Sequence, residues 1–356
     1  MTVHVALIFG GESPEHEVSI VSARFVAAQL REAGYDVTPV GIDVLGGWHK
    51  GEDSFVSLAE RVDQDFAVDL SQRAACLTDL VNGAFDVVFP LVHGVTGEDG
   101  SIQGMCELFG IPYVGGDPLC QALCYDKLST RMILKHLGLP QPDYVPVYRD
   151  TFVGGRYWVL DQVEASLHYP VFVKPSRTGS SIGITKAHSR NELMTALETA
   201  FQYDRRVIVE QTISGREIEV ALLGDFTPLI SAPGEIIPEN EFYDYDEKYV
   251  KNTTLFEVPA SMSVEQLQQL AEYATTAWRA TNCYGMARVD FMVSESGVYL
   301  NEINTVPGFT EISMYPRLLR EGGLTPPELM SRLVELAIDR GKHIRRYSSR
   351  SDWYKS

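Results

Sequence analysis

The 356-residue sequence lacks the features that mark membrane and exported proteins. It has no uninterrupted apolar run of the roughly 20 residues that a membrane helix needs. Its first residues, MTVHVALIFGG, lack the basic segment and the small-residue cleavage site of a signal peptide. We therefore expect a cytoplasmic protein that does not bind a membrane.

Cysteine is also scarce. The five cysteines are odd in number and include no CxxC pair with the spacing of metal ligands. This usage is typical of a reducing compartment, where disulfides do not persist. We interpret the five as buried or free thiols without function: Cys76, Cys106, Cys120, Cys124 and Cys283.

Positive charge is in deficit, with 30 Lys and Arg against 48 Asp and Glu and a formal net charge of -18. This balance argues against nucleic acid or an anionic membrane as the main partner. A phosphate ligand remains compatible with it, because a few clustered cations can bind an anion locally. The apolar share of 45% is ordinary for a globular protein, and the length predicts two or three domains. We find no internal repeat.

Strands and helices alternate in the first third of the chain. HVALIFGG is a buried strand, SIVSARFVAAQLREAGY has the spacing of an amphipathic helix, and DVTPVGID and FDVVFPLVHG are further strands. This order predicts a small parallel sheet with ligand-facing loops at the carboxyl ends of its strands. From Asp126 onward, strands instead come in pairs around Gly/Ser turns, as in YPVFVKPSRTGSSIGITKA and RVIVEQTISGREIEVALLGD.

A strand with polar residues precedes a Pro-Gly loop in YLNEINTVPGFTEIS. Glu302 and Asn304 are two residues apart, so an extended backbone places both on one face. Asp290, in ARVDF, lies on the strand before, and we expect the two strands to be adjacent in a hairpin with matching faces. Oxygen ligands of this kind suit Mg²⁺ bound together with nucleotide phosphates. The alternative is ordinary polar alternation on a solvent-facing strand.

Two lysines are candidates for binding phosphate. Lys174 leaves an apolar run in VFVKPSRTGSSIGI and needs an anionic partner, and the following Gly/Ser turn offers backbone N–H groups. Lys127, in CYDKLST, begins a helix, where a solvated surface lysine is the alternative. Glu210 and Glu217 flank the turn in VIVEQTISGREIEV, where carboxylates can accept hydrogen bonds from ribose hydroxyls.

Two glycine-rich loops carry further polar residues. Glu15 begins a helix in GGESPEHEVSI, where its carboxylate can bind a ligand or cap the helix. His93 and Glu98 lie in HGVTGEDGSIQG. We expect His93 to line a pocket rather than bind a metal, because no second histidine lies at ligand spacing.

Seven motifs together carry a resemblance to a known family. They are GGESPEHEVS, HGVTGEDGSIQG, DK, VKPSRTGSSIGI, FYDYDEKY, ARVDF and NEINTVPGFTEISMYP, in this order. The chain resembles the D-alanine–D-alanine ligases, a branch of the ATP-grasp superfamily, over nearly its whole length. The resemblance implies an α/β protein of three domains: an N-terminal parallel α/β domain and two α+β domains that hold ATP between them. We expect these domains over residues 1–119, 120–210 and 211–345, followed by a loose tail over residues 346–356.

The resemblance also implies a reaction and the residues that perform it. Such ligases phosphorylate the carboxylate of one D-alanine with ATP, and the amine of a second D-alanine attacks the acyl phosphate. The product serves peptidoglycan synthesis, and a homodimer is expected. The implied metal ligands are Asp290, Glu302 and Asn304, holding two Mg²⁺ ions with Mn²⁺ as an alternative. The implied ATP-binding residues are Lys127, Lys174, Glu210, Glu217 and Lys248.

The remaining implied roles concern the amino acids. Glu15 binds the first D-alanine's ammonium, and Ser180 and Tyr249 tie a loop to Glu15. The other positions are His93 in the pocket, Arg288 and Gly308 at the oxyanion, and Ser313 and Met314 at the second carboxylate. Two alternatives stay open: a ligase that uses D-lactate or D-serine as the second substrate, and an inactive nucleotide-binding regulator. Tyr249 favours D-alanine over D-lactate, and the intact set of ligands disfavours the regulator.

Overall fold

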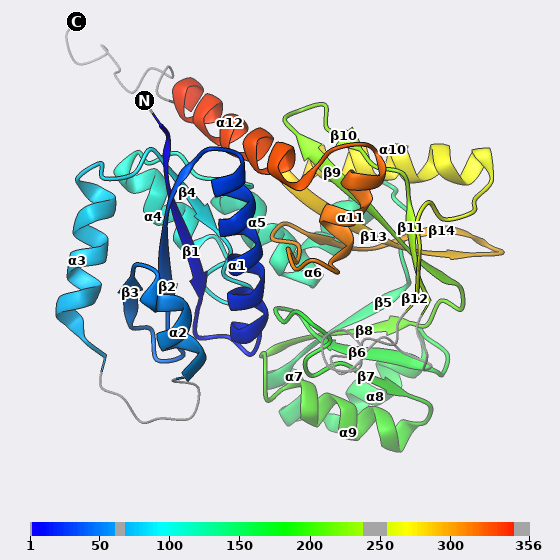
Figure 1. The fold of residues 1–356 in the computed structure, drawn as a ribbon. Helices are drawn as coiled ribbons and strands as arrows, with labels where there is room; N and C mark the ends of the chain where they lie inside the picture. Colours follow the sequence, from blue (N-terminus) through cyan, green and yellow to red (C-terminus); the bar gives the residue numbers. More distant parts are fainter. Residues whose placement is uncertain (1, 61–67, 238–254, 345–356) are drawn as a thin grey trace, which may run out of the picture.

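The computed structural model describes residues 2–60, 68–237 and 255–344, and over these ranges the strands form three sheets (Figure 1). Each sheet takes its strands from a successive part of the chain. The α/β class expected from the sequence is confirmed. The expected domain limits stay a prediction, and the expected tail lies outside the described residues.

The first sheet has the strand order β3-β2-β1-β4. Its strands are β1 (His4–Gly10), β2 (Asp36–Ile42), β3 (Trp48–Lys50) and β4 (Val87–Pro90). β2, β1 and β4 run parallel, whereas β3 is an antiparallel edge strand that the sequence pattern did not indicate. Helices α1 (His16–Glu32) and α2 (Asp53–Glu60) pack on one face, and α3 (Leu70–Val81) and α4 (Ser101–Phe109) on the other. Because both faces are covered, the central strands are apolar throughout, as parallel sheets require.

The second sheet has the order β5-β8-β6-β7 and is antiparallel. Its strands are β5 (Tyr144–Tyr148), β6 (Val171–Pro175), β7 (Thr185–Ala187) and β8 (Arg206–Gln211). One face packs on α7 (Arg149–Gly154), α8 (Arg156–Glu164) and α9 (Arg190–Ala200). Val171 and Val173 point into that core, so strand alternation turns Phe172 and Lys174 to the other face.

The third sheet has the order β12-β11-β9-β13-β14, with β10 also pairing β9. The strands are β9 (Arg216–Gly224), β10 (Leu229–Ile230), β11 (Gly234–Ile237), β12 (Leu255–Glu257), β13 (Gly285–Ser294) and β14 (Gly297–Asn304). Helices α5 (Pro118–Tyr125), α6 (Lys127–His136) and α10 (Val264–Ala280) cover one face. Thus β8 and β9, the two strands on either side of the Ser-Gly turn, belong to different sheets and do not pair with each other.

The first and third sheets share one hydrophobic core. Val5 and Leu7 of β1 belong to the same buried cluster as Ala221 and Met286 of the third sheet. Helices α11 (Met314–Glu321) and α12 (Pro326–Ile344) complete this cluster, and α12 runs between the two sheets across the top of the molecule (Figure 1). The second sheet has a separate core against its own helices.

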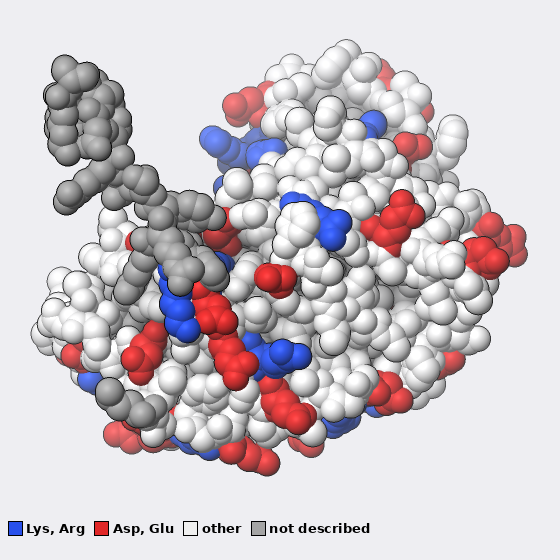
Figure 2. All heavy atoms as spheres, turned by 90° about the horizontal axis from the view of Figure 1, so that it is seen from above, with Lys and Arg blue, Asp and Glu red and all other residues white. Residues whose placement is uncertain are grey.

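Figure 2 and the helices describe the charge and the hydrophobicity of the molecule. On the face shown in Figure 2, acidic and basic side chains are interspersed rather than gathered into a large basic patch. Within residues 2–60, 68–237 and 255–344, no helix combines the length and the apolar character needed to cross a bilayer.

Candidate active site

A cavity of about 990 Å³ lies where the three sheets meet. Fourteen of the sixteen expected site residues are described, and thirteen of these line the cavity. The exception is Asp290, which is 1% exposed and is covered by two residues that do line it, Arg288 and Asn304. Residues from widely separated motifs therefore meet in one place.

A β-bulge sets the acidic face of the third sheet. Asp290 is opposite Glu302 and Phe291 is opposite Leu300, so Asn301 is the additional residue on β14. Leu300 and Ile303 both point into the core, three residues apart, because the bulge changes the phase of the alternation. Glu302 is thereby turned to the cavity on the same side as Asp290. The predicted hairpin with matching faces is confirmed.

Arg288 and Asp290 form a buried ion pair on this face. The Arg288 Nε and Nη2 atoms donate to the two Asp290 carboxylate oxygens, both at 2.7 Å, and Arg288 Nε lies 3.1 Å from Glu219 Oε1. Burial alone would lower the pKa of Arg288, but the charges of Asp290 and Glu219 raise it well above its ordinary value. The Asn304 amide also donates to Asp290 Oδ2 at 2.9 Å. This leaves the Asn304 carbonyl oxygen for another ligand.

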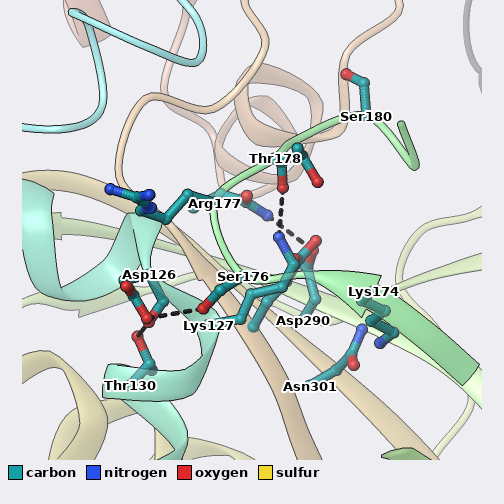
Figure 3. Close-up of polar contacts among 12 residues, drawn as sticks. Asp126, Lys127, Thr130, Lys174, Ser176, Arg177, Thr178, Ser180, Asp290 and Asn301 are labelled. Carbon is teal, nitrogen blue, oxygen red and sulfur yellow. Dashed lines mark hydrogen bonds and ion pairs between the residues drawn. The ribbon is translucent and has the colours of Figure 1, made fainter. Parts of the chain in front are cut away.

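Lys127, the first residue of α6, contacts the turn after β6 of the second sheet and β14 of the third (Figure 3). Its Nζ donates to the Thr178 carbonyl at 2.5 Å and lies 3.7 Å from Glu302 Oε2. The preceding residue, Asp126, caps α6 at the Ser129 N–H and accepts a hydrogen bond from Ser176 at 2.8 Å. Lys127 is thus held at the cavity rather than solvated as a surface lysine, which was the alternative.

Lys174 and Arg131 share the buried carboxylate of Glu210. Lys174 Nζ lies 2.6 Å from Glu210 Oε2, and Arg131 Nε donates to Oε1 at 2.7 Å. Burial raises the pKa of Glu210, but the two cations outweigh it and lower the pKa to about 2. The anionic partner that Lys174 was expected to need is therefore present. Arg131 was not singled out from the sequence, because it looks like an ordinary helix-surface cation there.

Glu15 and Ser180 connect the first sheet to the turn between β6 and β7. The Ser180 hydroxyl donates to Glu15 Oε1, and Glu15 is 7% exposed. Ser180 and Ser181 have positive φ angles of 49° and 61°, a region that costs free energy for residues other than glycine. A Cβ at Gly179 would lie 2.7 Å from Glu15 Oε2, so a larger residue there would displace the Glu15 carboxylate.

His93 and Glu98 lie beside Glu15 in the second glycine-rich loop. His93 is 5% exposed, and its Nε2 has no hydrogen-bond partner among the described residues. Burial lowers the pKa of His93 although the charge of Glu15 opposes it, so the ring is held neutral. Burial and the charge of Glu15 raise the pKa of Glu98 well above its ordinary value. The unpartnered Nε2 on a cavity residue agrees with the expected pocket role.

The Pro-Gly loop after β14 packs tightly at the start of α11. Ser313 Oγ accepts from the Thr310 N–H at 2.9 Å, and a Cβ at Gly308 would lie 3.0 Å from the same Oγ. Met314 is the first residue of α11 and is buried. The N–H groups at a helix start are a ready site for a carboxylate.

Glu217 lines the cavity from β9, opposite Met292. Lys248 and Tyr249 lie outside the described residues, as does the whole segment Glu239–Thr254.

Comparison with known proteins identifies the family. The family model described as "D-ala D-ala ligase N-terminus" matches residues 4–116, and "D-ala D-ala ligase C-terminus" matches residues 133–335. The chain belongs to the D-alanine–D-alanine ligase family. A D-alanine–D-alanine ligase of Acetivibrio thermocellus is 44% identical, covering 94% of this chain and 96% of the relative. One from Clostridium acetobutylicum is 43% identical, covering 96% and 99%.

Solved structures of this ligase family superimpose on nearly the whole chain, which confirms the expected three-domain ATP-grasp architecture. The D-alanine–D-alanine ligase of Coxiella burnetii has a TM-score of 0.79 at 34% identity, covering 97% of this chain and 96% of that one. The VanG D-Ala:D-Ser ligase of Enterococcus faecalis also has a TM-score of 0.79, at 35% identity, covering 95% and 100%. The family therefore includes proteins named for different second substrates.

Proposed function

We propose that this chain joins two D-alanine molecules to D-alanyl-D-alanine and converts ATP to ADP and phosphate. One observation supports this most strongly: carboxylates of the third sheet, lysines beside the second sheet and Glu15, at the start of α1, all line one cavity. Carboxylates and an amide can bind metal ions that in turn bind phosphates. A separate carboxylate can bind an ammonium group. The curated relatives are named D-alanine–D-alanine ligase, which describes this reaction.

ATP would lie between the second and third sheets. In this proposal Lys127 and Lys174 contact its phosphates, together with Lys248, while Glu210 and Glu217 lie nearer the adenine and ribose. Both oxygens of Glu210 already have cationic partners, so its contribution includes holding Lys174 in place. The acidic face beneath would repel a bare polyphosphate, because like charges at short range are unfavourable.

Asp290, Glu302 and Asn304 fit a magnesium site in their chemistry. They offer hard oxygen atoms from neighbouring positions of one hairpin, which is the ligand type that Mg²⁺ prefers. We propose that they hold two Mg²⁺ ions, with Mn²⁺ as an alternative. When bound, the ions neutralise charge on the phosphate oxygens during transfer.

The bond changes follow from this placement. A carboxylate oxygen of the first D-alanine attacks the γ-phosphorus and ADP leaves. The deprotonated amine of the second D-alanine then attacks the acyl carbon, and phosphate leaves as the peptide bond forms. Arg288 and the Gly308 N–H, which both line the cavity, would stabilise the oxyanion between these events.

The amino acids would be held from opposite sides. Glu15 binds the ammonium of the first D-alanine, and Ser180 and Tyr249 hold the Glu15 carboxylate in place. His93 lines the same pocket. Ser313 and the Met314 N–H bind the carboxylate of the second. The short network from Glu15 to Ser180 also closes the site toward water, which would otherwise hydrolyse the acyl phosphate.

The second substrate is the open point of specificity. A D-Ala:D-Ser ligase is among the solved relatives, and D-lactate is the further alternative expected from the sequence. We propose D-alanine, because curated relatives above 40% identity over nearly the whole chain are named for it. ATP, Mg²⁺ and D-alanine should give dipeptide in a mass-spectrometric assay. The proposal fails if D-serine or D-lactate is preferred at equal concentration.

We also propose a cytoplasmic homodimer. The location follows from the use of ATP, and the dimer rests on the family resemblance alone. Light scattering on the purified protein measures the mass directly, and a mass of one chain across the working concentration range would contradict the dimer.

A further inference from the structure

Three of the five cysteines lie together in the structure, a grouping that we did not expect from the sequence. Cys120 and Cys124 lie one turn apart on α5, and Cys283 follows α10. Their three sulfur atoms all lie within 4.8 Å of one another, and Cys120 Sγ is 3.5 Å from Cys283 Sγ. We propose that these thiols form a binding site for a thiophilic divalent cation of the zinc class, separate from the magnesium ligands.

The distances are close to those that a bound ion needs. A zinc ion lies about 2.3 Å from each thiolate sulfur, which places the sulfurs of a tetrahedral site about 3.8 Å apart. The one sulfur–sulfur distance of 3.5 Å and the upper limit of 4.8 Å for all three pairs are compatible with that value. In zinc sites with three protein ligands, a water molecule takes the fourth position.

The backbone around the three thiols is fixed by one carboxylate. Asp117 Oδ1 accepts from the Cys120 N–H at 2.8 Å, and Asp117 Oδ2 accepts from the Asn282 side chain. Asn282 has a φ of 56°, which turns the chain at the end of α10, and the Cys283 N–H returns to the Trp278 carbonyl at 2.9 Å. Both segments are therefore held before any ion binds, which lowers the entropy cost of binding.

Charge and access are also compatible with a cation. Three thiolates and a divalent ion leave one net negative charge, and Cys120 lies in the first turn of α5, where the helix dipole favours negative charge. Binding releases the three thiol protons, so affinity should rise with pH. Cys124 borders the large cavity, which provides a path from solvent to an otherwise buried cluster.

The cysteine cluster lies next to the start of the helix that carries Lys127, the proposed phosphate-binding lysine. α5 ends at Tyr125, and Asp126 is both the last cap of α5 and the first cap of α6, which begins at Lys127. An ion that fixes Cys120 and Cys124 therefore also fixes the helix that leads to Lys127. The binding test below needs neither ATP nor D-alanine, so its result is independent of the proposed ligase activity.

Cadmium is a suitable probe, because bound thiolates give it an ultraviolet charge-transfer absorption that oxygen ligands do not. The reduced full-length protein would be titrated with Cd²⁺ in excess Mg²⁺, which occupies oxygen sites. We expect one equivalent per chain, at higher affinity as pH rises, and displacement of the signal by Zn²⁺. Loss of an outer partner of a metal ligand lowers affinity by about 10- to 100-fold, so loss of a thiolate should cost on the order of 100-fold or more.

Cys106→Ala is the matched control for Cys120→Ala, because both cysteines are 0% exposed and only Cys120 belongs to the cluster. Cys120→Ala should lose the cadmium absorption and Cys106→Ala should keep it. Cys283→Ala gives the same comparison if Cys120→Ala does not fold, as judged by thermal melting without metal. The proposal is overturned if wild type shows no cadmium–thiolate absorption, if both cluster variants retain it, or if Cys106→Ala loses it equally.

Discussion

Asp290 and Glu302 are register partners on adjacent antiparallel strands, and the bulge at Asn301 turns both toward the cavity. Without the additional residue, Glu302 would continue the phase of Leu300 and point into the core. The same hairpin brings Asn304 to within 2.9 Å of Asp290. The polar strand before the Pro-Gly loop therefore faces the cavity rather than open solvent.

Glu302→Gln should nearly abolish ligation and leave the fold intact. The substitution removes a charge from the proposed metal ligands at nearly constant volume, and the Glu302 side chain is 32% exposed, so its loss leaves no deeply buried group unpaired. Phosphate release would be measured beside a thermal melt. Glu295→Gln, on the exposed turn of the same hairpin, is the control and should keep full activity. Near-normal turnover of Glu302→Gln would remove the metal assignment.

Lys174→Ala should weaken ATP binding or phosphoryl transfer by about 1.5–3 kcal/mol, the scale of a hydrogen bond between charged groups. Kinetics against ATP concentration measure this directly. Lys135→Ala removes an exposed lysine from α6 and should leave the same constants unchanged. If the two variants behave alike, Lys174 does not contact ATP.

Glu210→Gln should destabilise the fold at neutral pH by about 3 kcal/mol, because it leaves Arg131 and Lys174 buried without their anion. The folded-state pKa of about 2 lies below the ordinary 4.5. The contribution of Glu210 is therefore complete above about pH 4.5 and is lost as the pH falls toward 2.

Chemical unfolding of wild type and Glu210→Gln from pH 7 down to pH 3 measures this contribution. The difference in the free energy of unfolding between the two proteins should become smaller below pH 4.5. Glu198→Gln breaks an exposed pair with Arg156 and should cost less than about 1 kcal/mol throughout. If Glu210→Gln lost no more stability than Glu198→Gln, the proposed contribution of the buried Glu210, Arg131 and Lys174 would be contradicted.

Ser180→Ala and Ser180→Gly separate the hydroxyl from the backbone strain. Both remove the hydrogen bond to Glu15, and only glycine relaxes the positive φ of 49°. If the hydroxyl positions Glu15, both variants should lose about 1.5–3 kcal/mol of transition-state stabilisation in kcat/KM for D-alanine. Full activity in Ser180→Gly would show that the turn conformation, not the hydroxyl, matters.

The sequence predicted the site where a motif carries its chemistry locally. Strand alternation predicts that Glu302 and Asn304 share a face, but it does not reveal the bulge that turns this face to the cavity. Arg131 could not be predicted in this way, because its partner Glu210 lies on a different sheet and only tertiary packing joins them. The cysteine cluster was missed for the same reason: Cys283 lies far along the chain from Cys120, and helical spacing indicates only two of the three thiols.

The topology was partly predictable. Alternating strands and helices indicated the parallel sheet, whereas the edge strand β3 is only three residues long and carries too little pattern. The turn between β8 and β9 looks like a hairpin in sequence, yet its strands enter different sheets. Local turn chemistry does not reveal which partner a strand finds.

Oxygen-18 transfer tests the central claim most directly. D-alanine labelled with oxygen-18 in its carboxylate would be turned over with ATP and Mg²⁺, and the phosphate and nucleotide products weighed by mass spectrometry. An acyl phosphate intermediate predicts one labelled oxygen in the inorganic phosphate for each dipeptide formed, with unlabelled ADP. Unlabelled phosphate, or label appearing in AMP, would contradict the account.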